Sequence, residues 1–304
     1  MQNTRQFIRL VWLAPLLLYS ADALAWGLFT HVYFAQWLVW TMPLLDPNLR
    51  RAVQRFPRLV MAGACLPDLA LMSPLFRHTH HWQSSHNMLR IAATDEERAI
   101  AVGYASHLFV DVVAHNHFVP AHEAMWLQDS LITHVFGEWA MDAHLAPLLD
   151  ASPHKLLHEH HTLLAQFAAR SFDCPQPMAA RALRHLAAAD RLLRSVRLPQ
   201  FLYRALRLFD KGAFHHFIYY VSQTQDCIAQ IDSLFAGAQP AMEPELASSS
   251  QSLLAQLRDK CMGQLKARHH APIEFLWTTQ NSYNMKDMLA ISAPIAAPAN
   301  TSVG

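Results

Sequence analysis

The sequence predicts an all-α protein, because proline punctuates long apolar stretches that repeat with helical spacing. The chain of 304 residues holds 17 Pro but only 8 Gly, and 52% of its residues are hydrophobic. Tight turns between strands favour glycine, whereas proline marks the ends of helices. We find no stretch that alternates with the period of a strand. A chain of this length can bury a large core in one or two domains.

Residues 1–25 have the pattern of an export signal. Arg5 and Arg9 form a basic start, an apolar run over 10–21 follows, and Ala23-Leu24-Ala25 is a small-x-small cleavage site. The apolar run of about twelve residues is short for a membrane span, which needs about twenty. We therefore expect a periplasmic or secreted protein. The alternative is a protein that its uncleaved leader anchors in the membrane.

The charge balance gives no electrostatic reason to expect nucleic acid or an anionic membrane as an obligatory partner. The full sequence has a formal net charge of +1, and loss of 1–25, with two Arg and one Asp, leaves the mature chain near neutrality. No obligate protein partner is evident either. Export would permit disulfides, and the pairing stays open among Cys65, Cys174, Cys227 and Cys261.

Candidate ligand residues thin out from Ser152 onward, and we divide the mature chain there into two helical regions. A first region spans 26–150, and 151–290 is either a continuation of the same domain or a separate helical region. A disordered tail at 291–304 follows. The expected helices of both regions lie at 31–42, 47–61, 95–117, near 126–149, 153–172, 176–196, 199–211, 213–236 and 247–267.

The stretch GYASHLFVDVVAHNHFVP, residues 103–120, carries ligand-type side chains inside an apolar helix. His107 and Asp111 are four residues apart, so they lie on one face, one turn from each other. Burying them costs free energy unless something compensates. Zinc binds both imidazole and carboxylate. A hydrogen-bonded His–Asp pair in the core explains this stretch equally well.

Three further segments offer ligand-type side chains. His134 and Glu138 form a second i, i+4 pair, which a weak surface contact would also explain. Asp68 follows Pro67 in a turn, where a helix N-cap is the alternative. The polar segment RHTHHWQSSHN, residues 77–87, holds His78, His80, His81 and His86.

Taken in order, these residues resemble the zinc-dependent phospholipase C family and the single-strand-specific nucleases that share its fold. The ligand order in that superfamily is an amino-terminal Trp, then His, Asp, His, H-x3-D-x5-H, and H-x3-E or H-x3-D. This chain supplies Trp26, His31, Asp68, a histidine of the 77–87 segment, His107-x3-Asp111-x5-His117 and His134-x3-Glu138. The similarity covers residues 26–138. We prefer His86 as the loop ligand, with His81 second, and interpret His115 as structural.

The resemblance implies up to three zinc ions inside a phospholipase C/nuclease-like multi-helix fold, with 26–150 as the catalytic core. One ion would be held by Asp68, His86, His107 and Asp111. Its close partner would be held by Trp26, His31 and Asp111, and the third by His117, His134 and Glu138. Trp26 would bind through its own amino nitrogen, which requires cleavage before it. A zinc-activated water would hydrolyse a phosphate ester, with Asp68 as proton acceptor.

Three functions compete, of which the resemblance implies the first two. The closing H-x3-E and the absence of a basic groove favour a phosphodiester hydrolase of phospholipase C type. It would act on phospholipid head groups and touch the membrane surface transiently. The five-residue spacing from Trp26 to His31 favours a single-strand nuclease or nucleotidase, for which nucleic acid is the substrate. The third alternative is a non-catalytic metal-binding helical protein.

Overall fold

The computed structural model describes residues 27–119, 122, 130–210, 212–238, 240 and 244, and the regular elements in these ranges are helices. The all-α prediction is therefore confirmed for this part of the chain. The α-helices are α2 (Leu28–Thr41), α3 (Pro47–Arg55), α4 (Pro57–Gly63), α5 (Trp82–Ile91), α6 (Asp95–Val113), α8 (Ser130–Leu145), α9 (Pro153–Glu159), α10 (His161–Ser171), α11 (Gln176–Ser195), α12 (Leu198–Phe209), α13 (Ala213–Ile228) and α14 (Ile231–Phe235).

Four shorter elements connect them. Three are 3-10 helices, η2 (Pro67–Leu71), η3 (Pro74–Phe76) and η5 (Ala146–Leu148), and η4 (Ala114–Phe118) is a π-helix. The leader predicted at 1–25, the helix at 247–267 and the tail at 291–304 lie outside the described residues. Among the helices that are described, none combines the length and the apolarity that crossing a bilayer requires.

Prolines set several of the helix boundaries. Asp46 precedes Pro47 and accepts hydrogen bonds from two backbone N–H groups in the first turn of α3, at 2.7 and 3.0 Å. Pro57 lies at the start of α4, directly after α3 has ended. The single helix predicted over 47–61 is therefore wrong, because proline cannot continue the hydrogen-bond ladder of α3.

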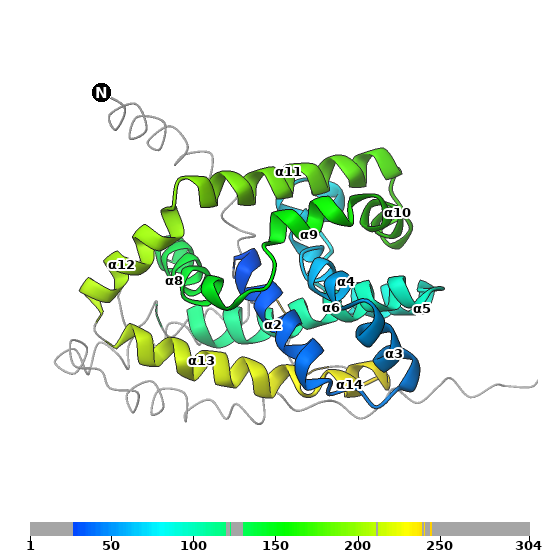
Figure 1. Ribbon diagram of the computed structural model, residues 1–304, viewed down its shortest axis with the longest axis horizontal. Coiled ribbons are helices and arrows are strands. Elements are labelled where there is room, and N and C mark those ends of the chain that lie inside the picture. Colours follow the sequence, from blue (N-terminus) through cyan, green and yellow to red (C-terminus); the bar gives the residue numbers. More distant parts are fainter. Residues whose placement is uncertain are drawn as a thin grey trace, which may run out of the picture.

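Helix α6 lies at the centre of the molecule, with α2 crossing it and α13 running beneath it (Figure 1). Every residue of α6 from Ala99 to Val113 is buried. Its start is capped by Thr94, whose hydroxyl accepts a hydrogen bond from the Glu97 N–H at 3.3 Å. One continuous cluster of buried apolar side chains surrounds α6 and extends along the chain from Leu28 to Leu234.

Two glycines let α4 and α6 approach at backbone distance. A Cβ atom on Gly103 would lie 1.9 Å from the Val60 carbonyl oxygen, and one on Gly63 would lie 2.3 Å from that of Ile100. No larger side chain fits at either position without separating the helices. The contact also brings the end of α4 within reach of His107, which lies one turn after Gly103 on α6.

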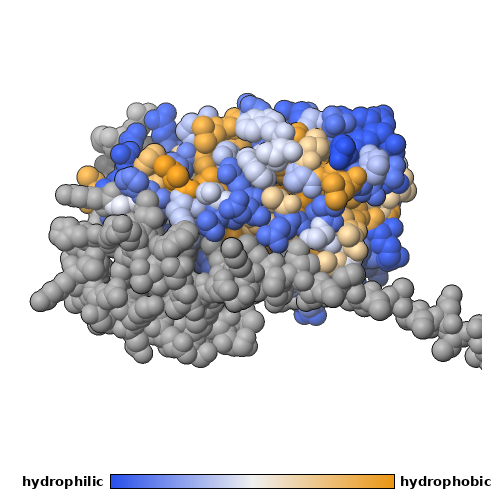
Figure 2. All heavy atoms as spheres, turned by 90° about the horizontal axis from the view of Figure 1, so that it is seen from below, coloured by the Kyte–Doolittle hydropathy of each residue, from blue (hydrophilic) through white to orange (hydrophobic). Residues whose placement is uncertain are grey.

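The helices after residue 150 pack onto the first region. Helix α9 contacts α4, α10 contacts α5, α12 contacts α8, and α13 contacts both α2 and α6. Apolar and hydrophilic side chains interleave on the face shown in Figure 2. Cys65, Cys174 and Cys227 are free thiols that form no disulfide with one another, and Cys261 lies outside the described residues.

Candidate metal centre

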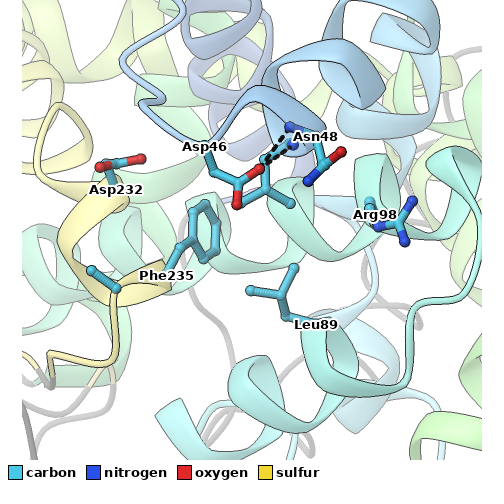
Figure 3. Close-up of a pocket in the computed structure, with 8 residues that line it drawn as sticks. Asp46, Asn48, Leu89, Arg98, Asp232 and Phe235 are labelled. Atoms are coloured by element: carbon cyan, nitrogen blue, oxygen red, sulfur yellow. Dashed lines mark hydrogen bonds between the residues drawn. The ribbon is translucent and has the colours of Figure 1, made fainter.

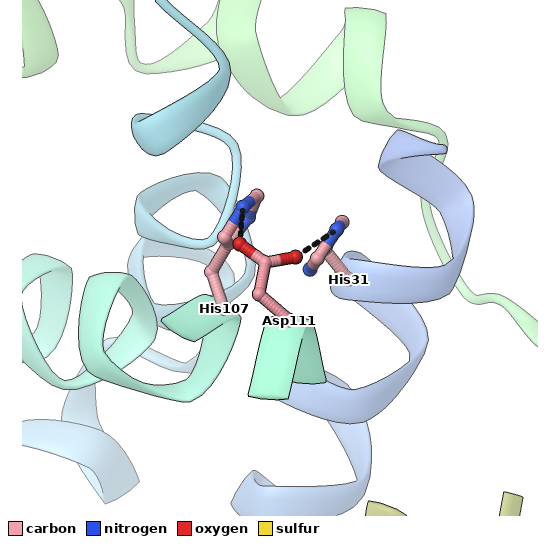
Figure 4. A group of neighbouring side chains, drawn as sticks. All are labelled: His31, His107 and Asp111. Carbon is pink, nitrogen blue, oxygen red and sulfur yellow. Dashed lines mark ion pairs between the residues drawn. The ribbon is translucent and has the colours of Figure 1, made fainter. Parts of the chain in front are cut away.

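Five buried ligand-type side chains meet beside α6, drawn from four separate segments of the chain. Helix α2 contributes one, η2 one, the loop before α5 one and α6 two. They form two groups in which the ligand atoms lie within 4.8 Å of one another. The groups are His31, His107 and Asp111, shown in Figure 4, and Asp68, His80 and His107.

The distances within this cluster match those between ligands of one metal ion. His107 Nε2 lies 3.0 Å from Asp111 Oδ2 and 3.3 Å from His80 Nε2. His80 Nε2 lies 3.6 Å from the same Asp111 oxygen. Asp68 Oδ1 is 3.8 Å from His80 Nε2 and 3.9 Å from His107 Nε2. Two ligands bound tetrahedrally to one zinc ion would be about 3.3 Å apart.

The second oxygen of Asp111 faces a different set of imidazoles. Asp111 Oδ1 lies 3.5 Å from His31 Nε2 and 4.0 Å from His115 Nε2. Figure 4 shows one oxygen of the carboxylate directed at His107 and the other at His31, and the two imidazole rings stack with centroids 3.5 Å apart. The two oxygens of one side chain are thus divided between two groups of ligands. His115, interpreted from sequence as structural, lies on η4 and approaches the same Asp111 oxygen as His31 does.

A backbone carbonyl fixes the orientation of the His107 ring. Its Nδ1 lies 2.7 Å from the carbonyl oxygen of Ala64, which follows α4. A carbonyl oxygen only accepts, so Nδ1 carries the hydrogen in this contact. In the neutral imidazole, Nε2 then directs a lone pair at Asp111 and His80.

His80 is oriented by a comparable outer contact. The Thr79 hydroxyl donates to the Pro67 carbonyl at 2.6 Å, so its oxygen is left to accept from His80 Nδ1 at 3.4 Å. The Tyr104 hydroxyl donates to the Thr79 carbonyl and holds this segment against α6. Imidazoles that bind metal through one nitrogen are normally held in this way through the other.

The electrostatics of the cluster favour a bound cation. Burial raises the pKa of Asp68 to about 7, although His107 opposes this shift. Burial, reinforced by the charge on His107, lowers the pKa of His80. Burial lowers the pKa of His107 as well, but the charges of Asp111 and Asp68 outweigh it and raise that pKa overall. Converging lone pairs and carboxylates at a buried site require a countercharge, and these donors suit zinc.

The residues predicted for a third ion are only partly described. Glu138 on α8 is fully buried, and burial raises its pKa well above the ordinary value. His117 on η4 is buried too, which lowers its pKa to about 4. His134 lies one turn before Glu138 on α8, but its side chain lies outside the described part, as does all of Trp26. The third site therefore stays a prediction.

The structure brings into the cluster a histidine of the 77–87 segment that differs from the two preferred from sequence. His80, which the sequence analysis did not select, lies with Asp68 and His107. His86, the preferred residue, lies within α5 and is half-buried. His81, the second choice, is exposed at the N-cap of α5. We therefore assign the position expected for His86 to His80.

This assignment gives a direct prediction. Loss of a residue that only hydrogen-bonds a metal ligand typically lowers metal affinity 10- to 100-fold. His80→Ala should weaken zinc binding by at least this factor, because it removes a ligand itself. His86→Ala, the matched control from the same segment, should bind zinc as the unmodified protein does. Metal analysis after dialysis against a zinc buffer would check both. Zinc loss in His86→Ala together with unchanged binding in His80→Ala would reverse the assignment.

A separate surface pocket lies away from the cluster, between α3, α5, α6 and α14 (Figure 3). The residues that line it are Asp46, Asn48, Leu49, Leu89, Arg98, Asp232, Phe235 and Ala236. The pocket and the cluster have no residue in common, so we do not connect it with metal chemistry.

Comparison with protein families supports the interpretation of the cluster. Residues 30–174 match the family model described as zinc dependent phospholipase C. Comparison with curated proteins and with solved structures gives no match. The matched segment begins one residue before His31 and includes α3 to α10. It contains all five clustered side chains as well as His117 and Glu138.

Proposed function

We propose that this chain, in which residues 30–174 match the zinc-dependent phospholipase C family, hydrolyses phosphodiesters, with phospholipid head groups as the substrate class. The family match supports a zinc-dependent hydrolase. The phospholipid preference rests on H-x3-E at His134 and Glu138 and on the nearly neutral chain. Export to the periplasm or the medium, where the leader would direct it, is part of the same proposal.

The observation that carries this proposal is the divided carboxylate of Asp111. Through Oδ2, Asp111 would share one zinc ion with Asp68, His80 and His107, because Asp111 Oδ2 and Asp68 Oδ1 both face the Nε2 atoms of the two histidines. Through Oδ1 it would share a second ion with His31. The proposed third ion, from the family resemblance, would use His117, His134 and Glu138.

Bound zinc would supply a Lewis acid that polarises phosphoryl oxygens and activates water. The chain's own residues prepare the site for this. The Ala64 carbonyl and the Thr79 hydroxyl hold His107 and His80 with their Nε2 atoms inward. Asp68, whose Oδ1 faces both imidazoles, is the proposed proton acceptor.

A nuclease or nucleotidase activity is the second candidate. The five-residue spacing between Trp26 and His31 favours it. The same zinc ligands would serve, since phospholipids and nucleic acids present the same phosphodiester group. Substrate therefore has to be separated from metal chemistry by experiment.

The test is a substrate screen with zinc-loaded full-length protein. We expect phospholipid vesicles to release diacylglycerol and a phosphorylated head group, and single-stranded DNA to remain intact under the same conditions. Chelator-treated protein is the control for contaminating activity. Nucleotide release without diacylglycerol would overturn the phospholipase proposal in favour of the nuclease. Protein that holds no zinc and cleaves neither substrate would overturn both.

A further inference from the structure

The first turn of α2 lacks a cap of its own. The N-cap residue, Gly27, has no side chain, and no acidic residue occurs in the first turn. The N–H groups at the start of a helix need acceptors from elsewhere, and the positive end of the helix dipole favours an anion. This requirement matters because His31 lies in the same turn.

Asp142 of α8 supplies the missing acceptor from across the molecule. Its Oδ1 accepts hydrogen bonds from the Thr30 N–H at 2.9 Å and from the Thr30 hydroxyl at 2.8 Å. Its Oδ2 lies 3.4 Å from the backbone nitrogen of Phe29. The fit is close, because a Cβ atom on Gly27 would lie 2.2 Å from Oδ2. Asp142 is fully buried and lies one turn after Glu138.

Arg194 of α11 compensates the buried charge of Asp142. Its Nη2 pairs with Asp142 Oδ2, and its guanidinium carbon lies 3.8 Å from the centre of the Phe29 ring. Its Nε also pairs with Asp190 Oδ1, at 3.2 Å. Removing one partner of such a pair would leave the other as an uncompensated buried charge. Helix α11 lies beyond the residues that match the family, so this clamp joins the second half of the chain to α2.

We propose that Asp142 positions His31 for metal binding, and that Arg194 holds Asp142 in place for this role. His31 directly follows Thr30, so the hydrogen bonds to Asp142 set the height and rotation of the turn that carries the imidazole. The clamped turn places His31 Nε2 3.5 Å from Asp111 Oδ1 with its ring stacked on His107. The inference rests on the proposed function in one respect, namely that His31 is a zinc ligand.

A double-mutant cycle separates positioning from a general contribution to folding. The variants are Asp142→Asn, His31→Ala and the combination, and the readout is zinc affinity from chelator competition on full-length protein. We expect Asp142→Asn to weaken zinc binding about tenfold, as for outer partners of other metal ligands. The double variant should bind no more weakly than His31→Ala alone, because Asp142 would act through His31. A purely structural role would make the two effects additive and would overturn the inference.

A milder variant tests the same contact, and a control variant tests whether any loss of a carboxylate weakens zinc binding. Thr30→Val removes only the hydroxyl contact and preserves side-chain shape, so it tests the clamp if Asp142→Asn fails to fold. It should weaken zinc binding severalfold, again without adding to His31→Ala. Asp95→Asn, which removes a carboxylate paired with Arg51, Arg55 and Arg98 at the surface, should leave zinc affinity unchanged.

The outcomes also distinguish this inference from the proposed function. Unmodified protein that holds no zinc would overturn both. Unmodified protein that binds zinc, with unchanged affinity in Asp142→Asn and Thr30→Val, would overturn the positioning role alone.

Discussion

Asp111→Asn is expected to lower phosphodiester hydrolysis by more than about 100-fold, beyond the 10- to 100-fold range for the outer partners of metal ligands. The physical reason is that one carboxylate serves two groups of imidazoles. Oδ2 lies 3.0 Å from His107 Nε2, and Oδ1 lies 3.5 Å from His31 Nε2. An amide offers one oxygen and one NH2 group, and the NH2 group cannot bind a cation. The substitution should therefore remove more than one equivalent of zinc.

Asp68→Asn is the control for Asp111→Asn, because it changes a carboxylate that contacts the cluster through one oxygen only. Asp68 approaches the cluster at 3.8 and 3.9 Å from two imidazole nitrogens, and only through Oδ1. We expect it to lose less zinc and less activity than Asp111→Asn. Metal content and initial rates, measured on both variants at equal protein concentration, would check the order. Equal and mild losses would show that Asp111 does not bridge two ions.

Helical periodicity predicted one part of the site, and the order of residues in the family resemblance predicted another. His107 and Asp111 are spaced by one helical turn, and the structure places them 3.0 Å apart on α6. His31 and Asp68 came from the order of residues in the family resemblance, and both lie in the cluster. Both residues are far from α6 in the sequence, so helical geometry alone gave no reason to expect them beside His107 and Asp111.

His80 could not be selected because it lies where the chain has no regular period. Two 3-10 helices, η2 and η3, turn the chain back between Asp68 and the loop. Helix α5 begins at Trp82, so His86 lies within this helix and His80 lies in the turn before it. The Thr79 hydroxyl bond to Pro67 sets that turn, and no spacing rule predicts a contact of this kind.

Two other features had weaker signals in the sequence. His134, Glu138 and Asp142 follow one another at intervals of one helical turn, so the spacing placed Asp142 on the same face of its helix. Nothing in the sequence indicated that Asp142 would accept hydrogen bonds from the first turn of α2. The single helix predicted over 153–172 is wrong, because α9 ends at Glu159 and α10 begins at His161. Proline indicated other breaks, and no proline lies at this one.

Removing zinc is expected to lower the free energy of unfolding by about 4 kcal/mol when free zinc had been about a thousandfold above its dissociation constant. The reason is that the folded, metal-free cluster retains buried carboxylates without their countercharge, with Asp68, Asp111 and Glu138 among them. Denaturant unfolding of zinc-loaded and chelator-treated protein would measure the difference. Added zinc should restore it. In Asp111→Asn the difference between the two forms should shrink.

In the metal-free protein, protons can neutralise the buried carboxylates in place of zinc. The pH dependence of stability therefore distinguishes the metal-free from the zinc-loaded form. Burial raises the pKa of Asp68 to about 7, above the value of about 3.9 in an unfolded chain. The folded apoprotein therefore binds a proton that the unfolded chain has released, and its stability should fall as pH rises toward and through 7. His117, whose pKa burial lowers to about 4, acts in the opposite direction only below about pH 6.5. Between pH 6.5 and 8 the chelated protein should thus lose stability while the zinc-loaded protein changes less. Parallel pH profiles in the two forms would mean that the cluster does not exchange protons for zinc.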